Sequence, residues 1–129
     1  MKNLDQENVI GISALLVHAA KIDEQYSDHE KKLIKEFIGS YQKEEDVALV
    51  LRKAEAIEQN SNQLLNFTNI VKKNTIEIKS DVIEVLWKII ISDKTVDQYE
   101  SNLMRRICGL IYFPDKLSGE IKLKLQKDK

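Results

Sequence analysis

The sequence predicts an all-α protein of about seven helices. Turn-forming residues are scarce, with four Gly and one Pro in 129 residues. Leu, Ile, Lys, Glu and Gln are common, and these residue types favour helices. Apolar residues also recur every three or four positions along most of the chain. A chain of this length buries one core, so we expect residues 1–129 to form a single domain.

Four helices are predicted in the first half of the chain. Residues 9–22 are apolar on almost every side, as is typical of a central helix. After a polar link, a second helix carries an apolar face over residues 33–41 and ends near Gly39. The third follows residues 47–57, with charges on one face and apolar residues on the other, namely Val47, Val50, Leu51, Ala54 and Ile57. A short fourth helix covers about residues 64–71.

Three further helices are predicted in the second half. Residues 75–80 alternate like a strand, but a lone strand has no partner here, so we interpret them as the entry to a helix. The fifth helix runs from Ser80 to Ile91 and is again apolar nearly all round. A sixth starts at about Asp97 and a seventh at Pro114, which suits a first helical turn.

The sequence also contains an internal repeat. Residues 13–39 align with residues 83–109 without gaps, with five informative identities: Leu16 and Leu86, Asp23 and Asp93, Glu30 and Glu100, Leu33 and Leu103, and Gly39 and Gly109. We therefore expect two pseudo-repeated helical hairpins packed around two central apolar helices.

Composition limits the location and the partners. The 20 basic and 21 acidic residues nearly cancel, which argues against a nucleic-acid partner. One cysteine and two histidines cannot build a zinc cluster and suit a reducing, cytoplasmic setting. The uncharged run at residues 8–20 is too short to span a bilayer, so we expect no stable membrane insertion. Basic residues of the second half leave a peripheral contact open: Arg105, Arg106, Lys122, Lys124, Lys127 and Lys129.

A pair of acidic residues flanks the link of each predicted hairpin. Asp23 and Glu30 flank the first link, and Asp93 and Glu100 flank the second. Carboxylate oxygens suit hard cations, so calcium, magnesium or manganese are the candidate ligands. Such an ion wants more oxygens than two carboxylates supply, and Asp28 and Asp97 are accessory candidates.

The same acids have a purely structural interpretation. Ser27 with Glu30, and Asp97 with Glu100, have the spacing of a capping box at a helix start. Both interpretations stay open on spacing alone.

Evidence for an enzyme is sparse. Asp23 and Glu30 are the only candidate acid–base pair, and the motifs of serine, phosphate-binding and zinc-protease sites are absent. Cys108 lies on an apolar face, where an inert thiol is expected. His18 and His29 have no visible partner and are assigned structural roles, and the large apolar side chains Phe37, Phe67, Trp87 and Met104 are assigned to the core.

Two stretches resemble the tellurite-resistance TerB-like family, including its small stand-alone bacterial members. They read LLVHAAKIDEQYSDHEKKLI (15–34) and NFTNIVKKNTIEIKSDVIEVLWKIIISDKTVDQYESNLMRRICGLI (66–111). The family pattern is a helix ending in Ala-x-x-Asp-Gly, a short link, and Glu opening the next helix. The matching residues are Asp23 and Glu30 in the first copy, and Leu86, Trp87, Asp93, Glu100, Arg105 and Arg106 in the second.

The resemblance implies a fold of about seven helices and acidic links that associate with divalent cations. It also implies a role in a stress or envelope-related response, since related domains are joined to a membrane-anchored J-domain co-chaperone. Glu24 and Lys94 stand where the family has Gly, so a cation is more readily expected at the first link, where Glu24 adds a carboxylate.

These observations together predict a non-enzymatic cytoplasmic helical module that binds a protein partner and is associated with a divalent cation. The alternatives are a metal-dependent, hydrolase-like enzyme that uses the acidic links and an interaction scaffold without metal.

Overall fold

The computed structural model describes residues 4–22, 26–61, 64–91 and 98–127, which form seven α-helices and no strand. The all-α prediction and the number of helices are therefore confirmed. The helices are α1 (Gln6–Ile22), α2 (Asp28–Gly39), α3 (Glu44–Gln59), α4 (Leu64–Lys72), α5 (Ile76–Ile91), α6 (Gln98–Ile111) and α7 (Asp115–Lys127).

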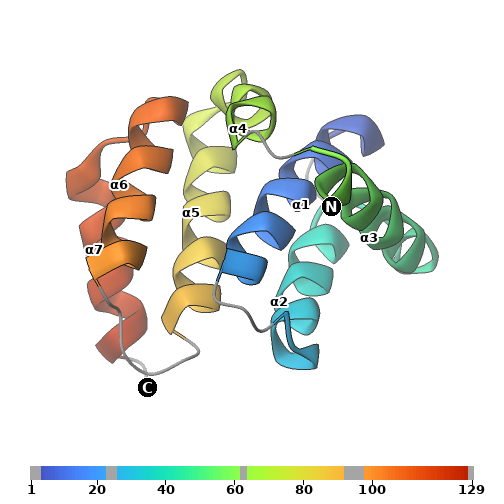
Figure 1. The fold of residues 1–129 in the computed structure, drawn as a ribbon, viewed down its shortest axis with the longest axis horizontal. Coiled ribbons are helices and arrows are strands. Elements are labelled where there is room, and N and C mark those ends of the chain that lie inside the picture. Colours follow the sequence, from blue (N-terminus) through green and yellow to red (C-terminus); the bar gives the residue numbers. More distant parts are fainter. Residues whose placement is uncertain (1–3, 23–25, 62–63, 92–97, 128–129) are drawn as a thin grey trace.

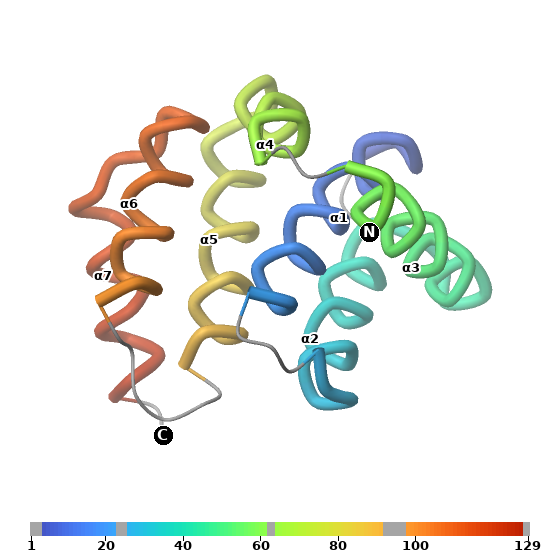
Figure 2. Tube along the Cα trace, viewed as in Figure 1, coloured from blue at the N-terminus to red at the C-terminus, as the bar shows by residue number. Residues whose placement is uncertain are grey.

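The two helices predicted to be central, α1 and α5, pack against each other in the middle of the molecule (Figures 1 and 2). Four consecutive residues of α1, 14–17, are completely buried, so this helix has no solvent-facing side there. In α5 the run 85–87 is likewise buried. An apolar helix surface of this kind is stable only when other helices cover it all round.

The remaining helices supply that cover. α2 and α3 pack on α1, and α2 also contacts α5. α7 packs along α5 on the opposite side of the molecule, together with α6 (Figure 1). α4, seen nearly end-on in Figure 2, contacts α1, α5 and α6. Within the described residues, no helix combines the length and apolar character that crossing a bilayer requires.

The predicted repeat has a counterpart in the helix boundaries. α1 begins at Gln6 and α5 begins at Ile76, and these starts differ by the same seventy positions as the aligned sequences. The predicted similarity of the two hairpins in space stays a prediction.

The predicted start of the fifth helix was wrong. α5 begins at Ile76 rather than Ser80, so the alternating segment is helical itself and not only an entry. The Thr75 hydroxyl accepts a hydrogen bond from the Ile78 amide at 3.3 Å and thereby caps the helix start.

The face predicted for the third helix also needs correction. Ile57, assigned to the apolar face, is 44% exposed, whereas the neighbouring Glu58 is buried at 8%. The last turn of α3 therefore directs a carboxylate toward α1. That carboxylate becomes part of the candidate site described below.

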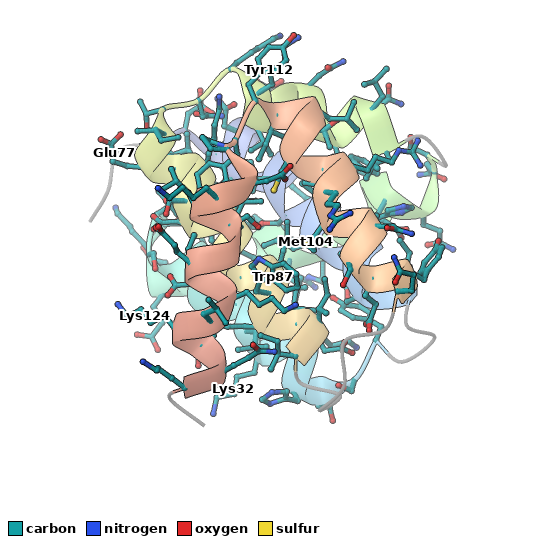
Figure 3. The ribbon with its side chains drawn as sticks, turned by 90° about the vertical axis from the view of Figure 1, so that its left-hand side faces the viewer. Lys32, Glu77, Trp87, Met104, Tyr112 and Lys124 are labelled. Carbon is teal, nitrogen blue, oxygen red and sulfur yellow. The ribbon has the colours of Figure 1, made fainter. Side chains whose placement is uncertain are left out.

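The core residues predicted in α5 and α6 are confirmed, whereas α7, predicted to carry Leu117, Ile121 and Leu125 on its apolar face, buries only Ser118 among its described residues. Trp87, Met104 and Cys108 are all buried, and Figure 3 views the molecule from the side of α6 and α7 that covers them. The Trp87 indole Nε1 donates a 2.9 Å hydrogen bond to Ser118 Oγ, which satisfies its buried polar atom. Burial raises the pKa of the Cys108 thiol, in keeping with an inert core cysteine.

Candidate functional site

The predicted cation ligands fall into two groups. Glu30, Glu100 and the accessory Asp28 belong to the described residues. The others lie outside them: Asp23, Asp93 and the accessory Glu24 and Asp97. The structure therefore gives one carboxylate at the far side of each link, and the pairing of these acids stays a prediction.

Glu30 lies in the first turn of α2 and closes a capping box with Ser27. The Ser27 amide donates to Glu30 Oε1 at 2.9 Å, and the Ser27 hydroxyl donates to the same oxygen at 3.2 Å. In return, the Glu30 amide donates to Ser27 Oγ at 3.3 Å. The structural interpretation of the first link is thus confirmed at this residue, while Asp28 beside it is exposed.

Both glutamates are almost completely buried. The exposed fraction is 2% for Glu30 and 4% for Glu100. Each lies in the first turn of its helix, where the helix dipole favours negative charge. A carboxylate that is removed from water needs such compensation, because desolvation penalises its ionised form.

Other acids surround the start of α2. Burial raises the pKa of the Tyr26 phenol above its ordinary value. The negative charges of Glu55, Glu30 and Glu58 add to this effect. Three carboxylates from α2 and α3 thus create a negative potential around Tyr26, which Lys31 partly offsets with its ammonium 5.0 Å from the ring centre.

Glu58 joins this region to α1. Its Oε1 accepts a 2.8 Å hydrogen bond from Lys21 Nζ, and its Oε2 lies 3.2 Å from His18 Nδ1. His18, for which the sequence showed no partner, therefore has one in Glu58, in keeping with the structural role assigned to it. Sequence reasoning missed Glu58 because it was counted with the solvent-facing charges of α3. His29, in contrast, is exposed as predicted.

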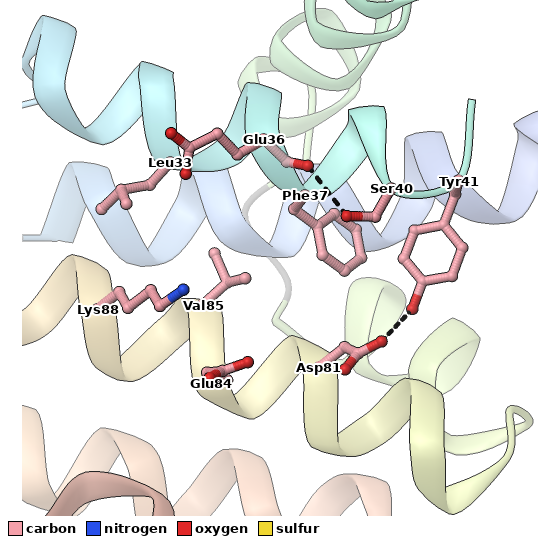
Figure 4. Close-up of a pocket in the computed structure, with 9 residues that line it drawn as sticks. All are labelled: Leu33, Glu36, Phe37, Ser40, Tyr41, Asp81, Glu84, Val85 and Lys88. Carbon is pink, nitrogen blue, oxygen red and sulfur yellow. Dashed lines mark hydrogen bonds between the residues drawn. The ribbon is translucent and has the colours of Figure 1, made fainter. Parts of the chain in front are cut away.

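A separate cavity of about 260 Å³ lies between α2 and α5 (Figure 4). Tyr41 donates its hydroxyl to Asp81 Oδ2 at 2.6 Å across the cavity, and Glu36, Glu84 and Lys88 also line it. Burial and the hydrogen bond to Asp81 raise the pKa of Tyr41, which keeps this hydroxyl protonated. The contact joins the turn after α2 to α5 through two residues that are forty positions apart, and nothing in the sequence had marked Asp81.

The geometry can be compared with what each function requires. Within residues 4–22, 26–61, 64–91 and 98–127, no three His, Cys, Asp or Glu side chains come together as a metal site. Of the described candidate ligands, neither Glu30 nor Glu100 lines the cavity between α2 and α5. A cation at either link would therefore depend on the aspartates outside the described residues, joined to one buried glutamate.

Comparison with known proteins gives one match. The family model of tellurite resistance protein TerB matches residues 9–123, which is nearly the whole chain and all seven helices at least in part. Searches for similar curated proteins and similar solved structures found no match.

Proposed function

The chain belongs to the TerB family, and from this membership we propose that it is a non-enzymatic cytoplasmic binding module whose first acidic link associates with a divalent cation. Its proposed role is to bind a protein partner in a stress or envelope-related response, and the family is named after one such response, resistance to tellurite.

One observation carries the cation association. Glu30 and Glu100 occupy matching places in the first turns of α2 and α6. The exposed fraction is only 2% for Glu30 and 4% for Glu100. Two buried carboxylates at the far sides of two acidic links are costly, and a bound cation would add to the compensation that the helix starts already give.

The donor set fits a hard ion. Carboxylate oxygens are the ligands that calcium, magnesium and manganese prefer, and a bound ion would supply positive charge without redox chemistry. Glu30 would hold it from α2, and Asp23 and Glu24 would approach from the link. At the second link Lys94 follows Asp93 in sequence and its positive charge would compete with a cation there, so the first link is the favoured site.

The negative surroundings support this choice. Glu55 and Glu58 of α3 act on Tyr26 together with Glu30, so the field at this end of the molecule attracts cations. The charge of Lys21 offsets Glu58 in part, because its ammonium is bonded to that carboxylate.

Thermal unfolding with and without each cation tests the proposal. A ligand that binds only the folded chain stabilises it by about 1.4 kcal/mol at tenfold excess over its Kd. For a domain of this size that is a rise in Tm of about 5 °C. We expect the rise in the wild type, its loss in Asp23→Asn and Glu30→Gln, and its retention in Asp93→Asn.

Matched controls separate binding from folding. Glu30→Gln keeps a side chain that can cap α2, so it removes the charge while preserving the box. Glu45→Gln removes one exposed charge from α3 and should leave the rise unchanged. Absence of any rise with all three ions would refute the cation association.

An interaction scaffold without metal is the second candidate. The capping box favours it, since Ser27 accounts for one oxygen of Glu30 without any ion. This candidate would be supported if none of the three cations changed the Tm of the wild type, while the Ser27→Ala variant had a lower Tm than the wild type.

A further inference from the structure

A groove of about 650 Å³ lies between the first half of α5 and α7. Its apolar surface comes from the two helices and from the turn before α7, namely from Ile76, Phe113, Leu117 and Ile121. Ile76 is 46% exposed and Leu117 is 38% exposed, so part of this surface is in contact with water. An apolar hollow that is open to solvent is typical of a binding surface.

The two walls of the groove are rows of side chains along neighbouring helices. The lining residues recur every three or four positions on each helix: 76, 77, 80 and 81 on α5, and 117, 120, 121 and 124 on α7. This spacing places side chains in ridges along one face of a helix. The hollow between two such ridges accommodates the ridge of a third helix, and amphipathic helices bind to proteins in this way.

The charges of the groove are mostly negative. Three carboxylates and one ammonium group line it, belonging to Glu77, Asp81, Glu120 and Lys124. Asp81 accepts the hydrogen bond of Tyr41, whereas Glu77 and Glu120 are exposed. Among the described residues, neither of these two glutamates forms an ion pair. The groove therefore attracts positive charge and repels negative charge.

This balance of charge distinguishes between the candidate occupants. Anionic lipid headgroups or nucleic acids would bring phosphates next to Glu77 and Glu120, and a second copy paired through this groove would set carboxylates against carboxylates. A cationic partner is opposed only by Lys124, which lies toward the lower end of the face in Figure 3, while Glu77 lies toward its upper end. The complementary partner therefore has an apolar face flanked by lysine or arginine.

We propose that the groove binds a short amphipathic helix of a protein partner, in which leucine-like side chains enter the groove and flanking lysine or arginine side chains meet Glu77 and Glu120. The inference rests on the proposed function in one respect, because both invoke a protein partner. None of the described residues 26–30 of the first acidic link lines the groove, so the cation association and this contact can fail separately.

Fluorescence anisotropy of a labelled synthetic peptide, mixed with the full chain, tests the proposal. The probe has about fourteen residues, or about four helical turns, with leucine on one face and lysine on both sides of it. Two companion peptides carry glutamate in place of lysine, or serine in place of leucine. We expect the lysine probe to bind with a Kd below about 100 μM, and each companion to bind at least about tenfold more weakly. Added salt should weaken the binding, because exposed charges contribute to it.

Variants of the groove locate the contact. Glu77→Gln combined with Glu120→Gln should weaken the binding of the lysine probe about fivefold, because two exposed ion pairs are lost. Lys124→Gln should strengthen it, since the one opposing charge of the groove is removed. All three residues are exposed, and circular dichroism checks that each variant is folded.

The controls carry the same charge changes on exposed positions of α3: Glu44→Gln with Glu45→Gln, and Lys53→Gln. Both should bind the lysine probe as the wild type does. Asp23→Asn should also bind it unchanged, so that a failure of the cation association is distinguished from a failure of this contact.

Three results would each overturn the proposal: a wild type that does not bind the lysine probe, a glutamate probe that binds equally well, or groove variants that bind as the controls do. Sedimentation of the wild type, alone and with phosphatidylglycerol vesicles, covers the other occupants. Association in either experiment that is lost in the groove variants, without binding of the probe, would assign the groove to that occupant instead.

Discussion

Lys21 at the end of α1 donates a 2.8 Å hydrogen bond to Glu58 on α3, thirty-seven residues further along the chain. The same carboxylate faces His18, so one buried acid holds two residues of α1. This contact holds the end of α1 against α3. In the sequence it lies directly before the first acidic link.

Removing the Glu58 carboxylate should therefore destabilise the fold. We expect Glu58→Ala to lower the free energy of unfolding by about 1–2 kcal/mol, because Lys21 and His18 lose their common partner. Glu58→Gln keeps an acceptor oxygen and should cost less. Urea unfolding measures both, with the exposed Glu45→Ala as the control. Equal stability of Glu58→Ala and the wild type would contradict the role given to this contact.

Alkaline pH should also destabilise the protein. Burial, together with the acids Glu55 and Asp81, raises the pKa of Tyr26 and Tyr41 above the ordinary value near 10.0. The folded chain then keeps both phenols protonated, while the unfolded chain releases these protons above about pH 10. Because the folded state binds more protons there, the free energy of unfolding falls as pH rises.

The measurement is urea unfolding between about pH 8 and about pH 11. Below the ordinary tyrosine pKa this contribution is fully present. We expect Tyr26→Phe combined with Tyr41→Phe to be less stable near neutral pH, yet to show a shallower decline above it. Tyr99→Phe, at a position 63% exposed, should decline as the wild type does. A double variant with an unchanged slope would disprove the assignment.

The end of α6 stores backbone strain at Tyr112. This residue has a φ of 59°, in the left-handed region that favours glycine. The Phe113 amide donates to the Cys108 carbonyl at 2.9 Å, which completes the helix end around Tyr112. The ring also lies against Lys72, whose ammonium is 4.6 Å from its centre.

Substitutions at position 112 should follow backbone preference. We expect Tyr112→Val to lose about 1–2 kcal/mol, since a β-branched residue is strained at positive φ. Tyr112→Gly relieves the strain but loses the Lys72 contact, so it should stay within about 0.5 kcal/mol of the wild type. Thermal unfolding of both variants measures the difference between them. Equal stabilities for Val and Gly would show that position 112 is not strained.

The helices were predictable from sequence because their apolar periodicity is strong. The uncharged run of α1 and the all-round apolar α5 could only be stable as buried helices. The start of α5 was harder, since Thr75 to Ser80 alternates as a strand does and the cap at Thr75 is a single hydroxyl contact.

The surroundings of the candidate site were much less predictable. Glu58 follows Ile57 in sequence, and periodicity placed the isoleucine inside and the glutamate outside. The structure reverses them because Lys21 and His18 of α1 offer Glu58 hydrogen-bond partners across the core boundary. Pairings of this kind depend on how α1 meets α3, which no local pattern contains. The capping box at Ser27 was found because its two partners are only three residues apart.

Gly11, inside α1, lies where α4 approaches this helix closely. A Cβ atom built at this position would overlap Ile70 Cδ1 of α4, although the rest of that side chain would lie at 3.4 Å or more. Glycine inside a helix ordinarily costs about 1 kcal/mol relative to alanine. At Gly11 that cost is offset by the room that it leaves for Ile70.

A double-mutant cycle therefore separates the two effects. In the wild type, Gly11→Ala should gain nothing or lose stability, because Ile70 must move. In Ile70→Val, which lacks the δ-methyl group, the same change should stabilise the protein by about 0.5–1 kcal/mol. Gly119→Ala in α7, where no atom lies within 4 Å of the added Cβ, should gain a similar amount in both backgrounds. If Gly11→Ala gained as much as Gly119→Ala without the Ile70 change, the packing of α1 against α4 could not be as close as described, because alanine would then fit where only glycine has room.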